Sequence, residues 1–412
     1  MQDYKGEKMS QKKLMILGGS RYILPIIKKA HELGAYVITC DYLPDNIAHK
    51  FSDEYCNISI LDKDVVLEKA KELKIDGIMS FACDPGVVTA AYVAEKMGLP
   101  SVGSYKSVSI LQDKGLFRKF LKENGFNVPN AKRYENVEEV FNDIDYFNWP
   151  VIVKPTDSAG SKGVVKVENP DKLRDAIKIA LASAHNGAFI VEDFLQQEGF
   201  SSDSDCFSID GKMVFYSFNS QRFDKVAENP YTPAAFSWPS SMSDENVDLL
   251  KKEIQRLVDL LGLKSSVYNV ETRQCINGKA YIMEFSPRGG GNRLSEMIEL
   301  GTGIDLLRGS IMAALGMKID DIYQKDFDGF WSEIILHSKK PGIFKSLEID
   351  DVIKDNIVEK DLWVKEGERV GGFKGANESM GTLVLKFDDR DKMEEVFADV
   401  DKYVRVELEE EE

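Results

Sequence analysis

Short apolar runs alternate with stretches of helical periodicity over the first hundred residues. KLMILGG (13–19) is followed by ILPIIKKAHELG (23–34), and AYVITCD (35–41) comes next. The pattern returns in VVLEKAKELKIDGIMSF (65–81). A strand, a glycine turn, a helix and another strand in succession are typical of a parallel, doubly wound α/β domain. Gly18 and Gly19 open the first helix, but GGSRYI is not the GxGxxG pattern, so dinucleotide binding is not favoured.

Composition excludes several classes of function. A chain of 412 residues suggests two or three domains. Its 69 acidic and 53 basic side chains give a net charge of −16, which argues against a nucleic-acid partner. We find no apolar run long enough for a membrane span and no signal-peptide pattern at the N-terminus, so we expect no membrane partner. Five scattered cysteines without a CxxC spacing predict a reduced, cytoplasmic protein. With four histidines, a metal here should be a hard cation on oxygen ligands.

From about residue 150 the pattern changes to strands joined by hairpin turns. Asp210-Gly211 and Asn277-Gly278 are both dipeptides that favour two-residue type I′ turns. Helices are expected near 171–184, 244–261 and 303–315, after two short helices within 104–126. The end of the chain, from about 330, predicts a third region of mixed strand and helix.

The second of these turns allows a test of pairing. A two-residue loop at 277–278 places Glu271 directly opposite Glu284, and Asn269 directly opposite Ser286. Directly opposed residues share a face of the sheet, with Cβ atoms about 5 Å apart, where like charges are destabilising. One interpretation is a pair of exposed glutamates on a solvated face. The other is a Mg²⁺ site, which the neighbouring polar residues in an otherwise apolar strand favour.

Arg288 follows Glu284 and Ser286 on the same strand parity. Its guanidinium could clamp a phosphate or a carboxylate with two hydrogen bonds. The three glycines after it, Gly289 to Gly291, let the backbone turn tightly beside these charged groups.

A second glycine-bearing segment is WPVIVKPTDSAGSKGVVKV (149–167). An apolar strand ends in Lys154-Pro155, and a small, hydroxyl-rich loop returns into another apolar strand. Its backbone amides and Ser158, Ser161 and Lys162 are possible phosphate donors. The alternative is an ordinary flexible hairpin loop. GxxxxGK[ST] is absent and no helix follows, so this is not a P-loop.

These segments, in this order, resemble the ATP-grasp superfamily of ATP-dependent carboxylate–amine ligases over roughly residues 13–400. Lys114 in DKGLFRKFLKENGFNVP and Lys154 in VIVKP match the two nucleotide-phosphate lysines. DSAGSKGV matches the flexible loop that closes over the phosphates. The resemblance therefore implies ATP contacts by the loop residues Ser158, Gly160, Ser161, Lys162 and Gly163.

VEDFL matches the hinge between the two ATP-grasp lobes. The resemblance implies that Glu192, the Asp193 carbonyl and the Leu195 amide read adenine, and that Glu198 holds the ribose. The following GFSSDSD departs from the pattern by an apparent two-residue insertion.

NVETR and MEFSPR match the paired metal-binding acids, Glu271 and Glu284. Ser286 stands where many relatives have an Asn ligand, and Arg288 matches the arginine that contacts the transferring phosphate or the substrate carboxylate.

The resemblance implies a fold of class α/β and α+β in three parts. A Rossmann-like preATP-grasp domain is expected over 1–113. A two-lobed ATP-grasp domain with its hinge near 191–195 follows over 114–330, and a small mixed C-terminal region occupies 331–412.

The implied activity uses ATP with Mg²⁺, or Mn²⁺ in its place. A small-molecule carboxylate becomes an acyl phosphate, which an amine then attacks; an amino acid or a similar metabolite is the favoured substrate. Phosphoribosylamine–glycine ligase is the alternative, and a non-catalytic ATP-binding regulatory protein is an alternative of another class. A homodimer is possible, since dimers are common among relatives. Candidate substrate contacts are the Gly18–Arg21 loop, Asp84, and the 228–241 loop with Tyr231 and Trp238.

Overall fold

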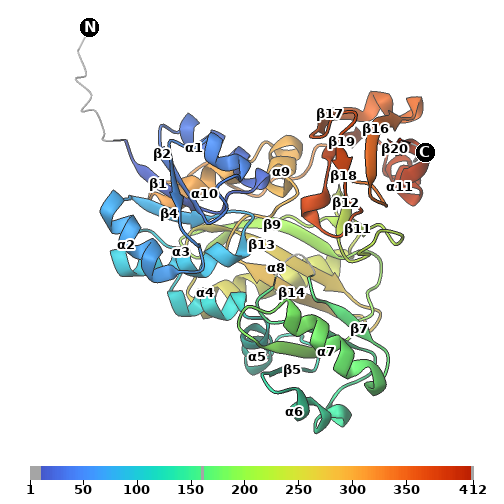
Figure 1. Ribbon diagram of the computed structural model, residues 1–412, viewed down its shortest axis with the longest axis horizontal. Helices are drawn as coiled ribbons and strands as arrows, with labels where there is room; N and C mark the ends of the chain where they lie inside the picture. Colours follow the sequence, from blue (N-terminus) through green and yellow to red (C-terminus); the bar gives the residue numbers. More distant parts are fainter. Residues whose placement is uncertain (1–10, 159–161, 410–412) are drawn as a thin grey trace.

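The computed structural model describes residues 11–158 and 162–409. These residues form five β-sheets with helices packed around them, and Figure 1 shows them gathered into an N-terminal part, a small lobe, a central sheet and a C-terminal part. Within the described ranges, no helix is both long and apolar enough to cross a membrane.

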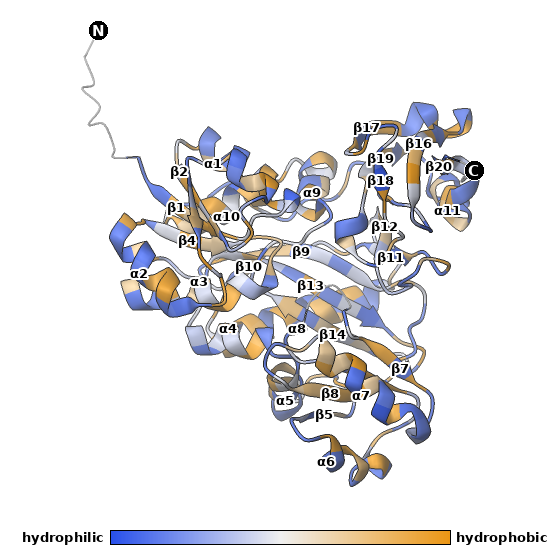
Figure 2. Ribbon diagram, in the orientation of Figure 1, coloured by the Kyte–Doolittle hydropathy of each residue, from blue (hydrophilic) through white to orange (hydrophobic). Residues whose placement is uncertain are grey.

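The N-terminal part is a four-stranded parallel sheet in the order β3-β2-β1-β4, which confirms the predicted doubly wound α/β region. Its strands are β1 (Lys13–Leu17), β2 (Tyr36–Asp41), β3 (Glu54–Asn57) and β4 (Gly77–Ser80), and its helices are α1 (Leu24–Glu32), α2 (Lys63–Leu73) and α3 (Asp84–Met97). The apolar runs form strands that are almost wholly buried because helices lie on both faces. In Figure 2 these strands are coloured hydrophobic, while α2 carries residues of both kinds.

Two helices lead from this domain into a smaller lobe. They are α4 (Tyr105–Gln112) and α5 (Lys114–Glu123), and each begins at a residue whose side chain caps it, Ser104 and Asp113 respectively. The small lobe has the antiparallel strand order β5-β8-β6-β7. Its elements are β5 (Ala131–Tyr134), α6 (Val137–Phe141), β6 (Val151–Pro155), β7 (Val165–Val167), α7 (Leu173–Ala182) and β8 (Phe189–Asp193). Helix α7 buries residues at spacings of three and four against this sheet.

The central sheet has the order β10-β9-β13-β14 and lies between the other parts (Figure 1). Its strands are β9 (Ser202–Ile209), β10 (Lys212–Phe215), β13 (Ser266–Gln274) and β14 (Ala280–Ser286), with helices α8 (Asp244–Leu261), α9 (Leu294–Thr302) and α10 (Leu306–Ala314). Helix α8 packs its buried face against β14 and β10, starting at a Ser243 cap and ending at the left-handed Gly262.

The two predicted hairpin turns differ. Asp210 and Gly211 both have positive φ, 49° and 80°, and Ile209 pairs with Lys212, so the two-residue turn there is confirmed. The type I′ turn at Asn277-Gly278 is wrong, because only Gly278 has a positive φ. The Cys275 amide instead bonds to the carbonyl of Lys279, which leaves a three-residue loop over 276–278.

A second irregularity restores the register beyond this loop. Thr272 pairs with Ile282 while Glu271 pairs with Glu284, so Met283 is the extra residue of a β-bulge. The predicted pairs Glu271–Glu284 and Asn269–Ser286 are therefore confirmed, although the turn that led to them has a different length.

The C-terminal part has a five-stranded sheet, β11-β12-β15-β19-β17, and a small sheet, β18-β16-β20. The strands are β11 (Ser220–Phe223), β12 (Pro233–Trp238), β15 (Phe330–Leu336), β16 (Gly342–Ile349), β17 (Ile357–Leu362), β18 (Arg369–Val370), β19 (Gly381–Phe387) and β20 (Val404–Leu408), and the helices are α11 (Arg390–Ala398) and α12 (Val400–Tyr403). Because β12 pairs with β15, this sheet crosses the boundary expected at residue 330. We keep the three-part division of the chain as a proposal.

Helix α10 fixes the N-terminal sheet beside the central one. It contacts α1, β4 and β13, and its residue Ile311 shares a hydrophobic cluster with Ile16 and Phe207. A Cβ on Gly77 would lie 2.3 Å from the Ala314 carbonyl oxygen, so the sheet and the helix approach more closely than a side chain permits. This close packing sets where the end of β4 and the start of α3 face the central sheet.

Candidate active site

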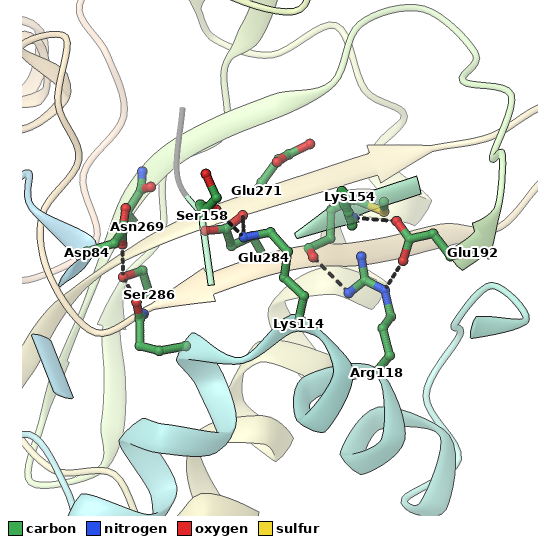
Figure 3. A network of polar contacts seen from close by, with 12 residues as sticks. Asp84, Lys114, Arg118, Lys154, Ser158, Glu192, Asn269, Glu271, Glu284 and Ser286 are labelled. Atoms are coloured by element: carbon green, nitrogen blue, oxygen red, sulfur yellow. Dashed lines mark hydrogen bonds and ion pairs between the residues drawn. The ribbon is translucent and has the colours of Figure 1, made fainter. Parts of the chain in front are cut away.

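A row of carboxylates crosses three strands of the central sheet. Glu271 on β13 pairs with Glu284 on β14 on one side and with Asp203 on β9 on the other. Figure 3 shows the Glu271 and Glu284 side chains on the same side of the sheet, as the pairing predicts. Both remain about one-third exposed, so their oxygens are open to a ligand.

These carboxylates fit a hard divalent cation whose remaining ligands come from a bound nucleotide and water. Among the described residues, no three Asp, Glu, His or Cys side chains converge closely enough to hold a metal by themselves. Mg²⁺ is usually bound by one or two carboxylates together with waters and substrate phosphates. Two opposed glutamates with open oxygens provide that donor set, and we propose Glu271 and Glu284 as the metal-binding pair.

Lys114 reaches this pair from the start of α5 (Figure 3). Its ammonium lies 3.7 Å from Glu284 and donates a hydrogen bond of 2.9 Å to the Ser158 carbonyl. The start of α5, strand β14 and the beginning of the glycine-rich loop therefore meet at one ammonium group. A phosphate placed here would contact both Lys114 and the loop.

Lys154 lies in a buried ion-pair network. Its ammonium binds Glu192, and Arg118 on α5 donates to the other oxygen of Glu192 at 2.8 Å. Burial alone would raise the pKa of Glu192, but Arg118 and Lys154 hold it at about 2. Glu192 is only 2% exposed and is bound by Arg118 and Lys154. Its contact with adenine stays a prediction, and it requires Glu192 to release one of these two cations.

Sequence reasoning missed Arg118, which is also 2% exposed and donates to the carbonyl of Met283. The available signal was an arginine one turn after Lys114 on the same helix.

Arg288 is held by the N-terminal domain. Its Nε and Nη2 donate to Asp84 at the start of α3, at 2.9 and 2.6 Å, and its Nη1 donates to Asn269 at 3.0 Å. The Ser286 hydroxyl also donates to Asp84 and accepts from Gln112. Burial favours the neutral guanidine, yet Asp84 raises the pKa of Arg288, so the group stays charged.

These contacts bear on two of the expected roles. The Ser286 hydroxyl is fully buried and already has two partners, so its part as a metal ligand stays a prediction that its contacts do not favour. The role of Arg288 toward phosphate or carboxylate also stays a prediction.

Two buried aspartates on β9 were not found from the sequence. Asp205 accepts hydrogen bonds from the Gly290 amide at 2.9 Å and from the Ser295 hydroxyl, so it fixes the glycine run and the start of α9. Asp203 accepts from Asn269 at 2.7 Å, and burial together with Glu271 raises the pKa of Asp203 to about 8. The signal was the pair of aspartates at alternate positions of SSDSDCFSI, which places both on one face of the strand.

The glycine run is required by close packing. A Cβ on Gly289 would lie 2.1 Å from the ring of Phe81, and one on Gly290 would lie 2.5 Å from Leu294. The Ala82 amide also bonds to the Gly289 carbonyl, so the loop after β4 lies directly on this segment. Gly291, in contrast, has open space around its Cβ position.

The glycine-rich loop and the hinge are described in part. Gly160 and Ser161 lie outside the described residues. Asp157 ties the start of the loop to the amides of residues 185 and 186, while Lys162 is exposed on the returning side. The ATP roles of Ser158, Lys162 and Gly163 stay predictions.

At the hinge, the Phe194 amide bonds to the Pro150 carbonyl, and the Glu198 amide bonds to the Gln274 carbonyl. The adenine roles of Asp193 and Leu195 and the ribose role of Glu198 stay predictions.

Trp238 is not a substrate contact in this geometry. It is fully buried, stacks near Phe327 and donates to the Ser204 and Ser217 hydroxyls. Tyr231 is 39% exposed. Asp84, another candidate, binds Arg288 and Ser286 as described above.

Residues 147–296 match the family model of the ATP-grasp domain. A formate-dependent phosphoribosylglycinamide formyltransferase of Synechococcus sp. (strain WH7803) is 24% identical over 366 residues, covering 87% of this chain and 90% of that protein. The carbamoyl phosphate synthase large chain of Thermotoga petrophila is 24% identical over 279 residues, covering 68% of this chain. This chain spans about a quarter of the length of that relative, since the match covers 24% of it.

Two solved structures are similar over nearly the whole chain. The L-amino acid ligase from Bacillus licheniformis gives a TM-score of 0.79 at 18% identity, with 97% of this chain and 99% of that chain covered. The phosphoribosylglycinamide synthetase from Anaerococcus prevotii gives 0.74 at 23% identity, with 97% and 100% covered. The chain therefore contains an ATP-grasp domain, and its fold as a whole is the one these ligase and synthetase structures share. The predicted ATP-grasp resemblance is confirmed.

We predict that Gly289→Ala impairs both stability and activity. The added methyl group must displace the Phe81 ring, and overpacking of this kind costs about 1–3 kcal/mol. The shift also moves Arg288, the neighbouring residue. Thermal denaturation and an ATP-turnover assay measure the two effects. Gly291→Ala is the matched control, since its methyl group meets nothing within 4 Å; equal behaviour of the two variants would contradict the packing argument.

We predict that Lys114→Ala and Lys154→Ala separate ATP binding from stability. Hydrogen bonds to charged groups contribute about 1.5–3 kcal/mol, so each variant should bind ATP at least about tenfold more weakly. Lys154→Ala should also lower the melting temperature, because Glu192 then keeps only Arg118 as a buried partner. Lys114→Ala should have a melting temperature close to that of wild type, because Glu284 beside it is partly exposed to solvent. Titration calorimetry with ATP and thermal denaturation test this, and unchanged ATP affinity in both variants would refute the lysine assignment.

Proposed function

We propose that this protein is an ATP- and Mg²⁺-dependent ligase that joins a small-molecule carboxylate to an amine. The observation that carries the proposal is the meeting of opposed Glu271 and Glu284 with Lys114 and the Ser158 carbonyl, within an ATP-grasp fold. Carboxylate oxygens for a cation and an ammonium for a phosphate therefore lie side by side. This is the arrangement that phosphoryl transfer needs, since its catalysis consists of positioning and charge neutralisation.

In the proposed reaction, the substrate carboxylate attacks the γ-phosphate of ATP, which gives an acyl phosphate and ADP. The amine then attacks the acyl carbon as its free base, inorganic phosphate leaves with the bonding electron pair, and the nitrogen loses a proton to water. Lys114 and Lys154 bind the phosphates, while Glu271 and Glu284 hold Mg²⁺, which neutralises developing charge when bound. The role we assign to Arg288 is to orient the carboxylate or the transferring phosphate. This requires the guanidinium to bind the ligand and Asp84 at the same time.

The proposal needs no nucleophile from the protein. The five cysteines are all free, and four of them are buried. Burial raises the pKa of Cys40 to about 12 and, with Asp84 adding to it, the pKa of Cys83 to about 11, so neither is a reactive thiolate near neutral pH. Unpaired, protonated cysteines also support our proposal of a cytoplasmic location.

There are two alternatives to an amino-acid ligase: phosphoribosylamine–glycine ligase and a non-catalytic ATP-binding protein. The likeness to a phosphoribosylglycinamide synthetase supports phosphoribosylamine–glycine ligase as a second candidate, while the likeness to an L-amino acid ligase supports an amino-acid substrate. A non-catalytic ATP-binding protein is disfavoured by the retention of both lysines and both glutamates. ADP release measured with pairs of amino acids, and with glycine plus phosphoribosylamine, distinguishes these possibilities, and absence of release with every pair would overturn the ligase proposal.

We predict that Glu284→Gln abolishes turnover but changes the ATP affinity measured without Mg²⁺ by no more than about threefold. The substitution removes a metal-binding charge and leaves the proposed adenine contacts, on β8 and beyond, untouched. Stability should change little, because repulsion from Glu271 and attraction to Lys114 are lost together. ADP release and ATP titration measure the effects. Glu348→Gln removes an exposed glutamate on β16 and is the matched control; full activity of Glu284→Gln would end the metal-site assignment.

A further inference from the structure

Glu333 is a buried carboxylate that the proposed chemistry does not use. It lies on β15, the central strand of the five-stranded sheet, between Phe236 on β12 and Val384 on β19. It is 0% exposed, and neither carboxylate oxygen has a hydrogen-bond partner among the described residues. Burying an unpaired carboxylate is strongly unfavourable, so a donor that belongs at this position would explain it.

The groups around Glu333 carry an excess of negative charge. Glu359 on β17 lies opposite Val384 and so in the same row of the sheet, while Glu296 faces it from α9. Arg293, the cation that acts on Glu333 within residues 11–158 and 162–409, binds Glu296 at 3.2 Å and Glu359 at 2.5 Å, but not Glu333. Burial, with Glu296 and Glu359 adding to it, raises the pKa of Glu333 well above its ordinary value despite Arg293.

We call Arg293, Glu296, Glu333 and Glu359 the Glu333 cluster. Tyr22 of the N-terminal domain packs against the C-terminal part of the chain. The Tyr22 hydroxyl donates to the Ala376 carbonyl at 3.2 Å, and the Tyr22 ring meets the Trp363 ring edge-on. Burial raises the pKa of the Tyr22 hydroxyl, the Ser379 hydroxyl opposes that rise, and Glu333 adds to it. Apart from this interaction with Tyr22, the buried Ser379 hydroxyl has no hydrogen-bond partner among the described residues.

One segment joins the Glu333 cluster to the candidate active site. Arg288 and Arg293 lie five residues apart, and Asn292 and Arg293 both have positive φ, 51° and 55°. These left-handed residues turn the chain, so that Arg288 faces Asp84 while Arg293 faces Thr382 and Glu359. Non-glycine residues held in this conformation often occur at functional sites.

We propose that Glu333, with Glu296 and Glu359 beside it, binds a positively charged ammonium group of the amine substrate. An ammonium has three donors, and Glu333, ionised when the ammonium binds, provides two acceptor oxygens beside the carboxylates of Glu296 and Glu359. The bound ammonium must pass one proton to water before its nitrogen attacks the acyl carbon. This inference rests on the proposed ligase function and names the charge of its amine substrate. Because Glu333 is closed to solvent, the proposal requires the chain around it to open before the amine enters, and the contact between Tyr22 and Ala376 is the one we expect to break.

The test compares a charged and an uncharged nucleophile on Glu333→Gln. With the amino-acid pair that gives the fastest ADP release, the KM for the amine should rise about tenfold to a hundredfold. Hydroxylamine, which is mostly uncharged at neutral pH, should still trap the acyl phosphate within about twofold of the wild-type rate. Glu348→Gln should match wild type in both assays. An unchanged KM for the amine in Glu333→Gln would overturn the inference, whereas wild type inactive with every nucleophile would overturn the ligase proposal instead.

A binding measurement keeps the inference testable without turnover. Methylammonium chloride serves as the minimal probe, and sodium chloride at equal concentration is the reference. Methylammonium should raise the melting temperature of wild type and Glu348→Gln above the reference, and this difference should vanish in Glu333→Gln. The same shift in all three proteins, or none in wild type, would overturn the ammonium site.

The pH dependence of stability provides a further prediction. The folded chain keeps the Glu333 proton at pH values where the unfolded chain has lost it, so wild-type stability falls as pH rises above the ordinary glutamate pKa. Glu333→Gln has no such loss. The melting temperature of Glu333→Gln should therefore exceed that of wild type by more at pH 8 than at pH 5, as measured by differential scanning calorimetry. The charged groups facing position 333 are Arg293, Glu296, Glu359 and the Tyr22 hydroxyl, and they are the same in both proteins. If the difference between the two melting temperatures became smaller from pH 5 to pH 8, burial would not be holding the Glu333 carboxyl group neutral.

Discussion

The ion pair between Asp84 and Arg288 connects the parts of the molecule that form the site. Asp84 begins α3 of the N-terminal domain, and Arg288 follows β14 of the central sheet. The same carboxylate accepts the Ser286 hydroxyl, and the same guanidinium donates to Asn269. One pair therefore aligns residues of α3, β13 and β14. Removing either partner would leave an unpaired buried charge, so the position of α3 and the end of β14 depend on each other.

The opposed pair Glu271 and Glu284 could be predicted from sequence because β-strand geometry is periodic. Any hairpin that leaves Glu271 and Glu284 directly opposed places both on one face. The loop is one residue longer than a type I′ turn, and the bulge at Met283 adds one residue to the other strand. The two departures cancel beyond the bulge. The prediction thus succeeded for the pair near the site while failing at the turn, where Asn277 does not adopt the left-handed conformation.

Residues whose roles depend on contacts between distant segments could not be derived in this way. Arg118 meets Glu192 across 74 positions of the chain, and Asp205 meets Gly290 across 85. No periodic rule links such segments. Glu333 had a local signal, since FWSEIIL places one charged residue inside an apolar strand. A charged residue at such a position is rarely fully buried unless it is paired. The sequence therefore marks Glu333 as a candidate functional residue in the same way as it marks the glutamate pair.

The distribution of charge links nucleotide and metal binding in the proposed mechanism. Lys114 lies beside Glu284, and Lys154 is bound to Glu192, so each proposed phosphate donor already has a carboxylate partner. A nucleotide phosphate alone would bring negative charge next to Glu271 and Glu284, and a cation alone would lie near Lys114. Bound together, the cation satisfies the glutamates while the phosphates satisfy the lysines. Each ligand then removes the repulsion that the other meets, and reciprocity requires both affinities to rise by the same factor. An acidic protein of net charge −16 can in this way bind a polyanion without a basic surface.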